Sequence, residues 1–172
     1  VKRIAAAARM VGNDRADFDQ ETREPTSEVP VAVLAGASKP PPVAERSTFG
    51  AKLGKKFVVS VEVNPPVGLD LAKQLAAAKM LKAGGVDVIN IADGARAQAR
   101  MGNLAMAARV QRELGMETIL HVCGRDRNLL ASLAHLLAAY ELGVRNLVII
   151  TGDPSKMGDF PDATPVYDMD SI

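Results

Sequence analysis

The amino-acid sequence predicts an α/β fold in which parallel strands alternate with helices, of the (βα)8 TIM-barrel type. Apolar runs rich in β-branched residues recur about every 30 residues, the length of a strand, a helix and their connections. Aromatic residues make up only 3% of the chain and Trp is absent, as is typical of helices packed on buried parallel strands. The predicted strands are residues 57–63, 86–91, 117–122 and 146–150.

The segments between these runs are predicted to be helices that end at glycine. The third segment is the clearest, because its large apolar residues are spaced by three or four positions and form one stripe: Leu130, Leu133, Leu137 and Tyr140. Glycines stand before the second, third and fourth strands, where a helix commonly ends in a left-handed residue: Gly84, Gly85, Gly115 and Gly143.

The first connection between a strand and a helix favours a barrel over an open doubly wound sheet. A dinucleotide-binding open sheet would show Gly-x-Gly-x-x-Gly after its first strand. This chain instead has Asn64-Pro65-Pro66, which offers few backbone donors to a pyrophosphate. A complete barrel takes ~250 residues, and four βα units are counted before Ile172. We therefore expect about half of a barrel, and a chain that is a fragment.

The N-terminal part differs from the rest in composition. Residues 1–12 are Ala-rich and end in Gly12, which predicts the C-terminal helix of an upstream domain. Residues 13–48 mix charge, Ser and Pro, including the run Pro40-Pro41-Pro42, and are predicted to be a linker. The half barrel is expected to occupy residues 49–172.

Charge and cysteine content restrict the classes of partner. The chain has 21 basic and 20 acidic residues, so no long-range field attracts nucleic acid or anionic lipid. The cluster of Lys52, Lys55 and Lys56 is expected to be solvated. Cys123 is the only cysteine, which excludes an intrachain disulfide and fits a cytoplasmic protein. No apolar run approaches the ~20 residues of a membrane helix, and no metal site is predicted.

Polar residues close each predicted strand, at the edge where ligands bind in both architectures. Strand alternation places Glu62 on the face that points into a barrel, where loss of hydration would favour its protonated form. An edge strand with a water-facing Glu62 is the alternative. Asp93 before glycine and Asp153 before proline could equally form turns or caps, and His121 could be a core histidine.

Together these strand ends resemble the methylenetetrahydrofolate reductase family, flavin enzymes built on a (βα)8 barrel. The resemblance covers about residues 49–172 and is carried by four motifs in order: VSVEVNPP at 59–66, INIADGARAQARMGN at 89–103, LHVCGRDRN at 120–128 and ITGDPSKMGDFPDATPVYD at 150–168. This form of the sequence is similar to bifunctional proteins in which a homocysteine methyltransferase precedes the reductase.

The resemblance implies reduction of 5,10-methylenetetrahydrofolate to 5-methyltetrahydrofolate by NAD(P)H through FAD or another flavin. Glu62 matches the general acid that protonates the departing ring nitrogen, and Asp153 matches a carboxylate beside flavin and folate. Further residues match flavin-binding positions: Asp93, His121, Thr151, Gly152 and Tyr167. Ala92 stands where the family commonly has threonine, so one flavin hydrogen bond is expected to be missing.

Two other functions fit the same pattern of strands and helices. One is a non-catalytic half-barrel module that self-associates to cover its open edges. The other is a different barrel enzyme, such as an aldolase or sugar-phosphate isomerase, although no strand end carries the lysine of a Schiff-base aldolase. For the reductase itself the expected partners are a folate substrate and either a second copy of the chain or a fused methyltransferase domain.

Overall fold

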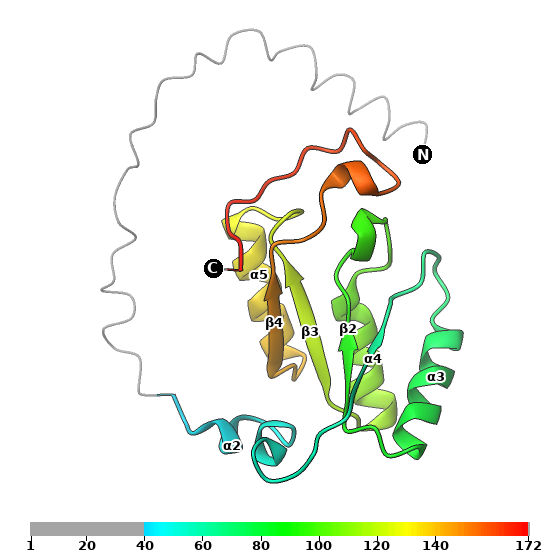
Figure 1. The fold of residues 1–172 in the computed structure, drawn as a ribbon, viewed down its shortest axis with the longest axis vertical. Helices are drawn as coiled ribbons and strands as arrows, with labels where there is room; N and C mark the ends of the chain where they lie inside the picture. Colours follow the sequence, from blue (N-terminus) through cyan, green and yellow to red (C-terminus); the bar gives the residue numbers. More distant parts are fainter. Residues whose placement is uncertain (1–39, 172) are drawn as a thin grey trace, which may run out of the picture. The chain divides into compact units, whose positions relative to one another are not determined.

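Four parallel strands form one sheet in the order in which they occur in the chain, β1-β2-β3-β4 (Figure 1). Their bounds are β1 Ser60–Val63, β2 Val88–Ile91, β3 Thr118–Cys123 and β4 Asn146–Ile150. Each begins within three residues of the predicted start. Glu62 pairs with Asn90 across β1 and β2, and His121 pairs with Val148 across β3 and β4.

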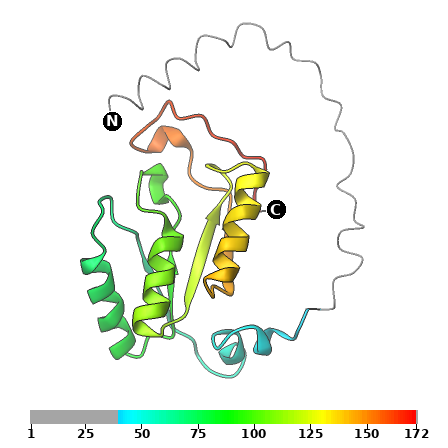
Figure 2. The ribbon, with the colours of Figure 1, turned by 180° about the vertical axis from the view of Figure 1, so that it is seen from behind.

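Three helices connect the strands and lie on one face of the sheet, as Figures 1 and 2 show from opposite sides. They are α3 Ala72–Ala83, α4 Asn103–Leu114 and α5 Leu129–Glu141. A doubly wound sheet reverses its strand order and carries helices on both faces, whereas a barrel keeps the chain order and one helical layer. The predicted α/β fold of barrel type is thus confirmed, with four strands present in the described residues.

The computed structural model describes residues 40–171. The predicted helix within residues 1–12 and most of the predicted linker lie outside this range. The folded unit begins at Pro41, eight residues before the expected boundary at residue 49, because residues 41–48 include the short helix α2 Val43–Arg46 and contacts to the sheet. It is followed by the 3-10 turn η3, Gly50–Lys52.

The core lies between the sheet and the helices. Residues of β2 and β3 that face the helices are buried against α4, which explains why these positions are mostly apolar, whereas Asn90 and His121 lie on the other face. Core side chains include Ile89, Ile91, Met106, Val110 and Leu120. The predicted helix-terminating glycines are confirmed at three positions with positive φ: Gly85, Gly115 and Gly143.

The apolar stripe of the third predicted helix does not pack into this core. Leu130, Leu133, Leu137 and Tyr140 are all exposed on α5, and Leu147 and Ile149 of β4 are exposed beside them. The fourth predicted βα unit also lacks its helix, because β4 is followed by the 3-10 turn η5, Ser155–Met157, and by coil to residue 171. The stripe is helical, as predicted, and a following helix would cover these side chains in a closed barrel.

The predicted solvated lysine cluster has a structural role in part. Lys52 and Lys56 both form ion pairs with Asp87 at 3.0 and 2.6 Å, and the N–H of Val59 donates to the same carboxylate. Hydrogen bonds from Lys56, from Lys52 and from this N–H hold the pKa of Asp87 well below its ordinary value. The contacts attach the segment after η3 to the start of β2.

None of the helices within residues 40–171 is long and apolar enough to cross a bilayer.

Candidate active site at the carboxyl ends of the strands

A pocket of about 400 Å³ lies at the carboxyl ends of the strands, the edge at which barrel enzymes carry their active sites. All four strands or the loops that follow them contribute to it. It is lined by Glu62, Ala92, Asp93, Gly94, Ala95, His121, Ile150, Gly152 and Asp153. The structure therefore brings five of the seven predicted site residues together: Glu62, Asp93, His121, Gly152 and Asp153.

Glu62 extends from the face of the sheet that carries no helix. Val61 and Val63 are half-buried toward the helices, whereas Ser60 and Glu62 are exposed, as strand alternation predicts. The expected loss of hydration at Glu62 is not found. The reason is that this face is enclosed only where opposing strands complete a barrel, and the described residues supply four of them.

Asp93 lies at the end of β2 and is only 8% exposed. Arg127 donates to both of its carboxylate oxygens at 2.5 and 3.2 Å, and the N–H of Cys123 donates to it at 3.0 Å. Burial opposes the charge on Arg127, but the hydrogen bonds to Asp93 keep the pKa of Arg127 above its ordinary value. The carboxylate of Asp93 therefore fastens the ends of β2 and β3 to each other.

Asp153 follows β4 in the segment Thr151-Gly152-Asp153. Its carboxylate accepts a hydrogen bond from the N–H of Arg96 at 2.8 Å, in the loop after β2. The residue that precedes η5 is Pro154, and no side chain caps this turn. Asp153 thus joins two active-site loops and does not cap a helix, the alternative that the sequence left open.

Gly152 makes the close approach of this segment possible. Its φ is +100°, a conformation that side chains disfavour, and a Cβ at this position would overlap the Sγ of Cys123. Burial raises the pKa of the Cys123 thiol, so this residue fills space as a neutral group.

His121 is half-buried on β3 and lines the pocket. Its carbonyl accepts a hydrogen bond from the side chain of Asn103 at 2.7 Å. Asn103 is 1% exposed at the first position of α4, so it holds the helix start against the strand that carries His121. Asn103 gives no local signal of this role in the sequence, since it stands within a helical segment.

Thr151 and Tyr167 do not line the pocket. The Thr151 hydroxyl lies 3.0 Å from that of Ser171, and its carbonyl accepts from the N–H of Arg125. Tyr167 is 36% exposed in the segment that follows β4, drawn from orange to red in Figure 1. Thr151 nevertheless lies between Ile150 and Gly152, which both line the pocket.

A second hollow of about 490 Å³ adjoins the first and shares Glu62, Ala95 and Asp153 with it. Its other walls are Asn64, Arg96, Gln98 and Arg100. The Arg100 guanidinium donates to the Pro65 carbonyl at 2.9 Å and to the Gln98 side chain at 2.5 Å. Arg96 and Arg100 are not among the predicted site residues, although both lie in the motif at 89–103.

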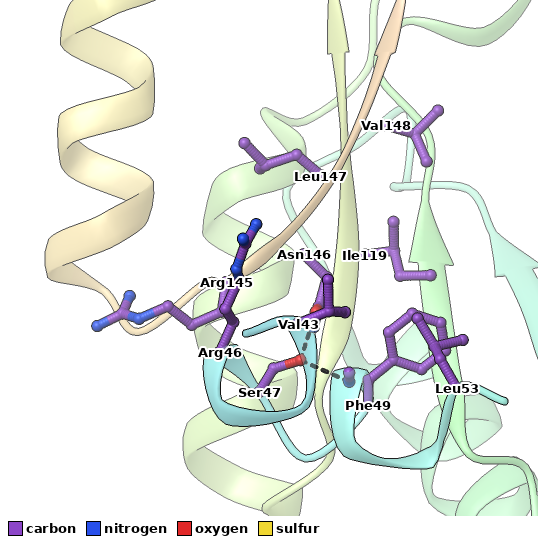
Figure 3. Close-up of a pocket in the computed structure, with 11 residues that line it drawn as sticks. Val43, Arg46, Ser47, Phe49, Leu53, Ile119, Arg145, Asn146, Leu147 and Val148 are labelled. Atoms are coloured by element: carbon purple, nitrogen blue, oxygen red, sulfur yellow. Dashed lines mark hydrogen bonds between the residues drawn. The ribbon is translucent and has the colours of Figure 1, made fainter. Parts of the chain in front are cut away.

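A third pocket, of about 280 Å³, lies at the amino ends of β3 and β4 (Figure 3). Ser47 donates to the Asn146 side chain at 2.7 Å and accepts from the Gly50 N–H at 2.8 Å. Glu117 accepts from the N–H groups of Thr48 and Phe49. These contacts attach the segment of Ser47 to Phe49 to the starts of β3 and β4. The amino-end face of a barrel serves stability and not catalysis.

Within residues 40–171 no group of three or more His, Cys, Asp and Glu side chains is arranged to hold a metal ion.

Comparison with known proteins gives one family match over the part of the chain that carries the sheet. The family model of methylenetetrahydrofolate reductase matches residues 49–171, which contain all four strands and every residue of the first pocket. No curated protein matches the chain. The match covers well over half of the sequence, so the chain belongs to the methylenetetrahydrofolate reductase family.

Proposed function

We propose that this chain carries the catalytic edge of a flavin-dependent enzyme that reduces 5,10-methylenetetrahydrofolate with NAD(P)H. Membership of the family supports methylenetetrahydrofolate reduction in general. The single observation that supports the detailed assignment is that Glu62, His121 and Asp153, which come from β1, β3 and the loop after β4, line one pocket. Sequence separation between them exceeds one βα unit, so only the parallel sheet brings them together.

The residues around the pocket fit the ring system of a flavin. Its walls combine small residues, Ala92, Gly94, Ala95 and Gly152, with polar groups, and a flat ring needs both close approach and hydrogen bonds at its edge. The volume of about 400 Å³ lies in the ordinary range of small-molecule sites. Enzymes of this family are generally flavin-dependent, and a bound flavin supplies the hydride transfer between NAD(P)H and folate.

Glu62 is proposed as the general acid. Opening the five-membered folate ring breaks a carbon–nitrogen bond, and the departing nitrogen must receive a proton. Glu62 is exposed to the pocket, and its nearest strand neighbour, Asn90, donates to Ser60 and not to the Glu62 carboxyl. The carboxyl group of Glu62 is thus available to hold and deliver the proton.

Asp153 is proposed to stabilise the cation that ring opening leaves on the folate. A carboxylate has about four lone-pair sites, and the hydrogen bond from Arg96 occupies one of them. This bond fixes the orientation of the carboxylate and leaves its charge directed at a ligand. An oriented charge acts on a developing cation without reorganisation during the reaction.

The other predicted flavin contacts stay proposals, and they differ in whether the side chain or the main chain would meet the flavin. His121 and Gly152 line the pocket directly. Asp93 would meet a flavin through its main chain, because its carboxylate is engaged by Arg127 and Cys123. Thr151 lies between two residues that line the pocket, and Tyr167 lies in the segment that follows β4.

The proposal is tested by separating the two half-reactions in Glu62→Gln. We expect unchanged flavin affinity by fluorescence titration and unchanged flavin reduction by NAD(P)H, with folate reduction slowed by about 10²–10⁴-fold. Glu113→Gln is the matched control, because Glu113 is a partly exposed glutamate on α4 that pairs with Arg109. Loss of both half-reactions to the same extent, or wild-type chain that binds no flavin, would refute the assignment.

We also propose that the reductase works beside a homocysteine methyltransferase domain or as a homo-oligomer. The support is the sequence resemblance for the first and, for the second, the exposed apolar residues of α5 and β4. Sedimentation of the purified chain separates a monomer from a self-associating half barrel.

A further inference from the structure

Arg125 lies outside the pocket but contacts the loops that form it. It follows β3 by two residues, and its side chain is only 5% exposed. Its N–H donates to the Thr151 carbonyl at 3.1 Å, and its carbonyl accepts from the N–H of Val166 at 2.8 Å. The main chain of Arg125 thus continues the pairing of β3 with β4 beyond the ends of the strands.

The guanidinium of Arg125 contacts three separate loops. It donates to both carboxylate oxygens of Asp126 at 2.6 Å, to the Asp153 carbonyl at 2.9 Å and to the Gly94 carbonyl at 3.3 Å. Asp126 beside it raises the pKa of Arg125 above its ordinary value, so the group stays charged. A planar fork of donors can hold several acceptors in fixed directions, which an ammonium group cannot.

Two of these contacts control one hydrogen bond of the site. The Asp153 carboxylate accepts from the Arg96 N–H, and Arg96 follows Gly94 by two residues in the turn η4, Ala95–Ala97. Arg125 holds the carbonyl of Asp153 on one side and the carbonyl of Gly94 on the other. It therefore fixes both the donor loop and the acceptor residue of that hydrogen bond.

The glycines beside Arg125 are fitted to its side chain. A Cβ on Gly94 would lie 2.6 Å from the guanidinium, and a Cβ on Gly152 would lie 3.2 Å from the Arg125 Cβ. Both glycines line the pocket. The guanidinium is thus packed behind the pocket wall, where it can set the position of the wall without touching a ligand.

We infer that Arg125 is a positioning residue that orients the Asp153 carboxylate in the active site. The inference rests on the proposed function, since it gives Arg125 a role in the step that uses Asp153. The carboxylate is exposed and depends on the loops for its direction. A misplacement of about 1 Å caused by a distant residue can slow a reaction about 10²-fold.

The first test uses the ligand-free chain and hydrogen exchange resolved by peptide. In Arg125→Ala we expect at least ~10-fold faster exchange in residues 94–97 and 151–154, with unchanged exchange in α3 and α4. Arg109→Ala is the control, because this arginine is on the surface of α4. Unchanged exchange in both loops, or an equal increase throughout the chain, would overturn the inference.

The second test uses the flavin-loaded chain. Arg125→Ala is expected to slow the folate step about 10²-fold, a larger loss than in its flavin affinity or in flavin reduction by NAD(P)H. Added guanidinium at non-denaturing concentration should restore part of that rate, and Arg125→Lys should not, because lysine lacks the fork. If Arg125→Ala fails to fold, Arg125→Lys carries both tests. If Arg125→Ala shows faster exchange in both loops but reduces folate at the wild-type rate, the positioning role is refuted and the proposed function stands. If the wild-type chain binds no flavin, only the proposed function is refuted.

Discussion

The ion pair between Asp93 and Arg127 offers the most quantitative test of how the site is built. The side chains are 9% and 19% exposed, and their closest approach is 2.5 Å. Asp93→Ala removes the acceptor of the Arg127 guanidinium and of the Cys123 N–H. Breaking a buried pair from one side costs about 3–5 kcal/mol. Because water can reach part of Arg127, we expect a loss at the lower end of that range, about 3 kcal/mol.

A double-mutant cycle separates the pair from its surroundings. Asp93→Ala, Arg127→Ala and the double variant are unfolded in urea at pH 7 without ligand, followed by circular dichroism. We expect a coupling energy of about 1.5–3 kcal/mol, as for hydrogen bonds to charged groups. The exposed pair of Arg109 and Glu113 on α4 is the control and should show a smaller coupling.

The result that would contradict this reasoning is additivity. If the double variant loses the sum of the single losses to within ~0.5 kcal/mol, the carboxylate of Asp93 does not depend on Arg127. The carboxylate would then be free for a ligand, as a direct flavin contact requires. A large coupling supports Asp93 as a brace between β2 and β3 that presents its main chain to the pocket.

Three further predictions concern stability. Gly152→Ala should cost about 1–3 kcal/mol, because φ is +100° and the Cβ would overlap Cys123 Sγ, whereas Gly68→Ala, with open space around it, should change the melting temperature little. Asp87 has a lowered pKa, so its contribution to the free energy of unfolding is present above about pH 4 and is lost as the pH falls. Asp87→Asn should therefore be less stable than wild type at pH 7, and the difference in stability should shrink in acid. Burial lowers the pKa of His135, so the imidazole resists protonation in the folded protein, and stability should fall as the pH drops through about 6.5. This loss of stability should be smaller in His135→Leu. A pH profile that is the same in the variant and the wild type would contradict the prediction.

The strands could be predicted from the sequence because their signal is local. The face of a parallel strand that helices cover is mostly apolar, and β2 and β3 follow this rule at Ile89, Ile91 and Leu120. The barrel type also had a local signal, since Asn64-Pro65-Pro66 stands where a phosphate-binding turn would be. Glu62 could be identified because alternation along one strand fixes the face on which its side chain lies.

The environment of each residue could not be predicted in the same way. The stripe of Leu130, Leu133 and Leu137 shows a helix face, but whether that face is buried depends on which element lies beside it. Here it is exposed. The hydration of Glu62 likewise depends on strands across the barrel, and the described sheet leaves that face open.

The sequence by itself determined the elements, their order and the polar residues that end each strand, because these follow from periodicities along the chain. Only the tertiary structure decided which of those residues meet. It placed Glu62, His121 and Asp153 at one pocket, whose lining does not include the side chains of Thr151 and Tyr167. It also paired Asp93 with Arg127 and placed the Arg125 guanidinium against the carbonyls of Asp153 and Gly94. Contacts across 28 to 34 positions of sequence depend on strand register and loop conformation, which no local pattern encodes.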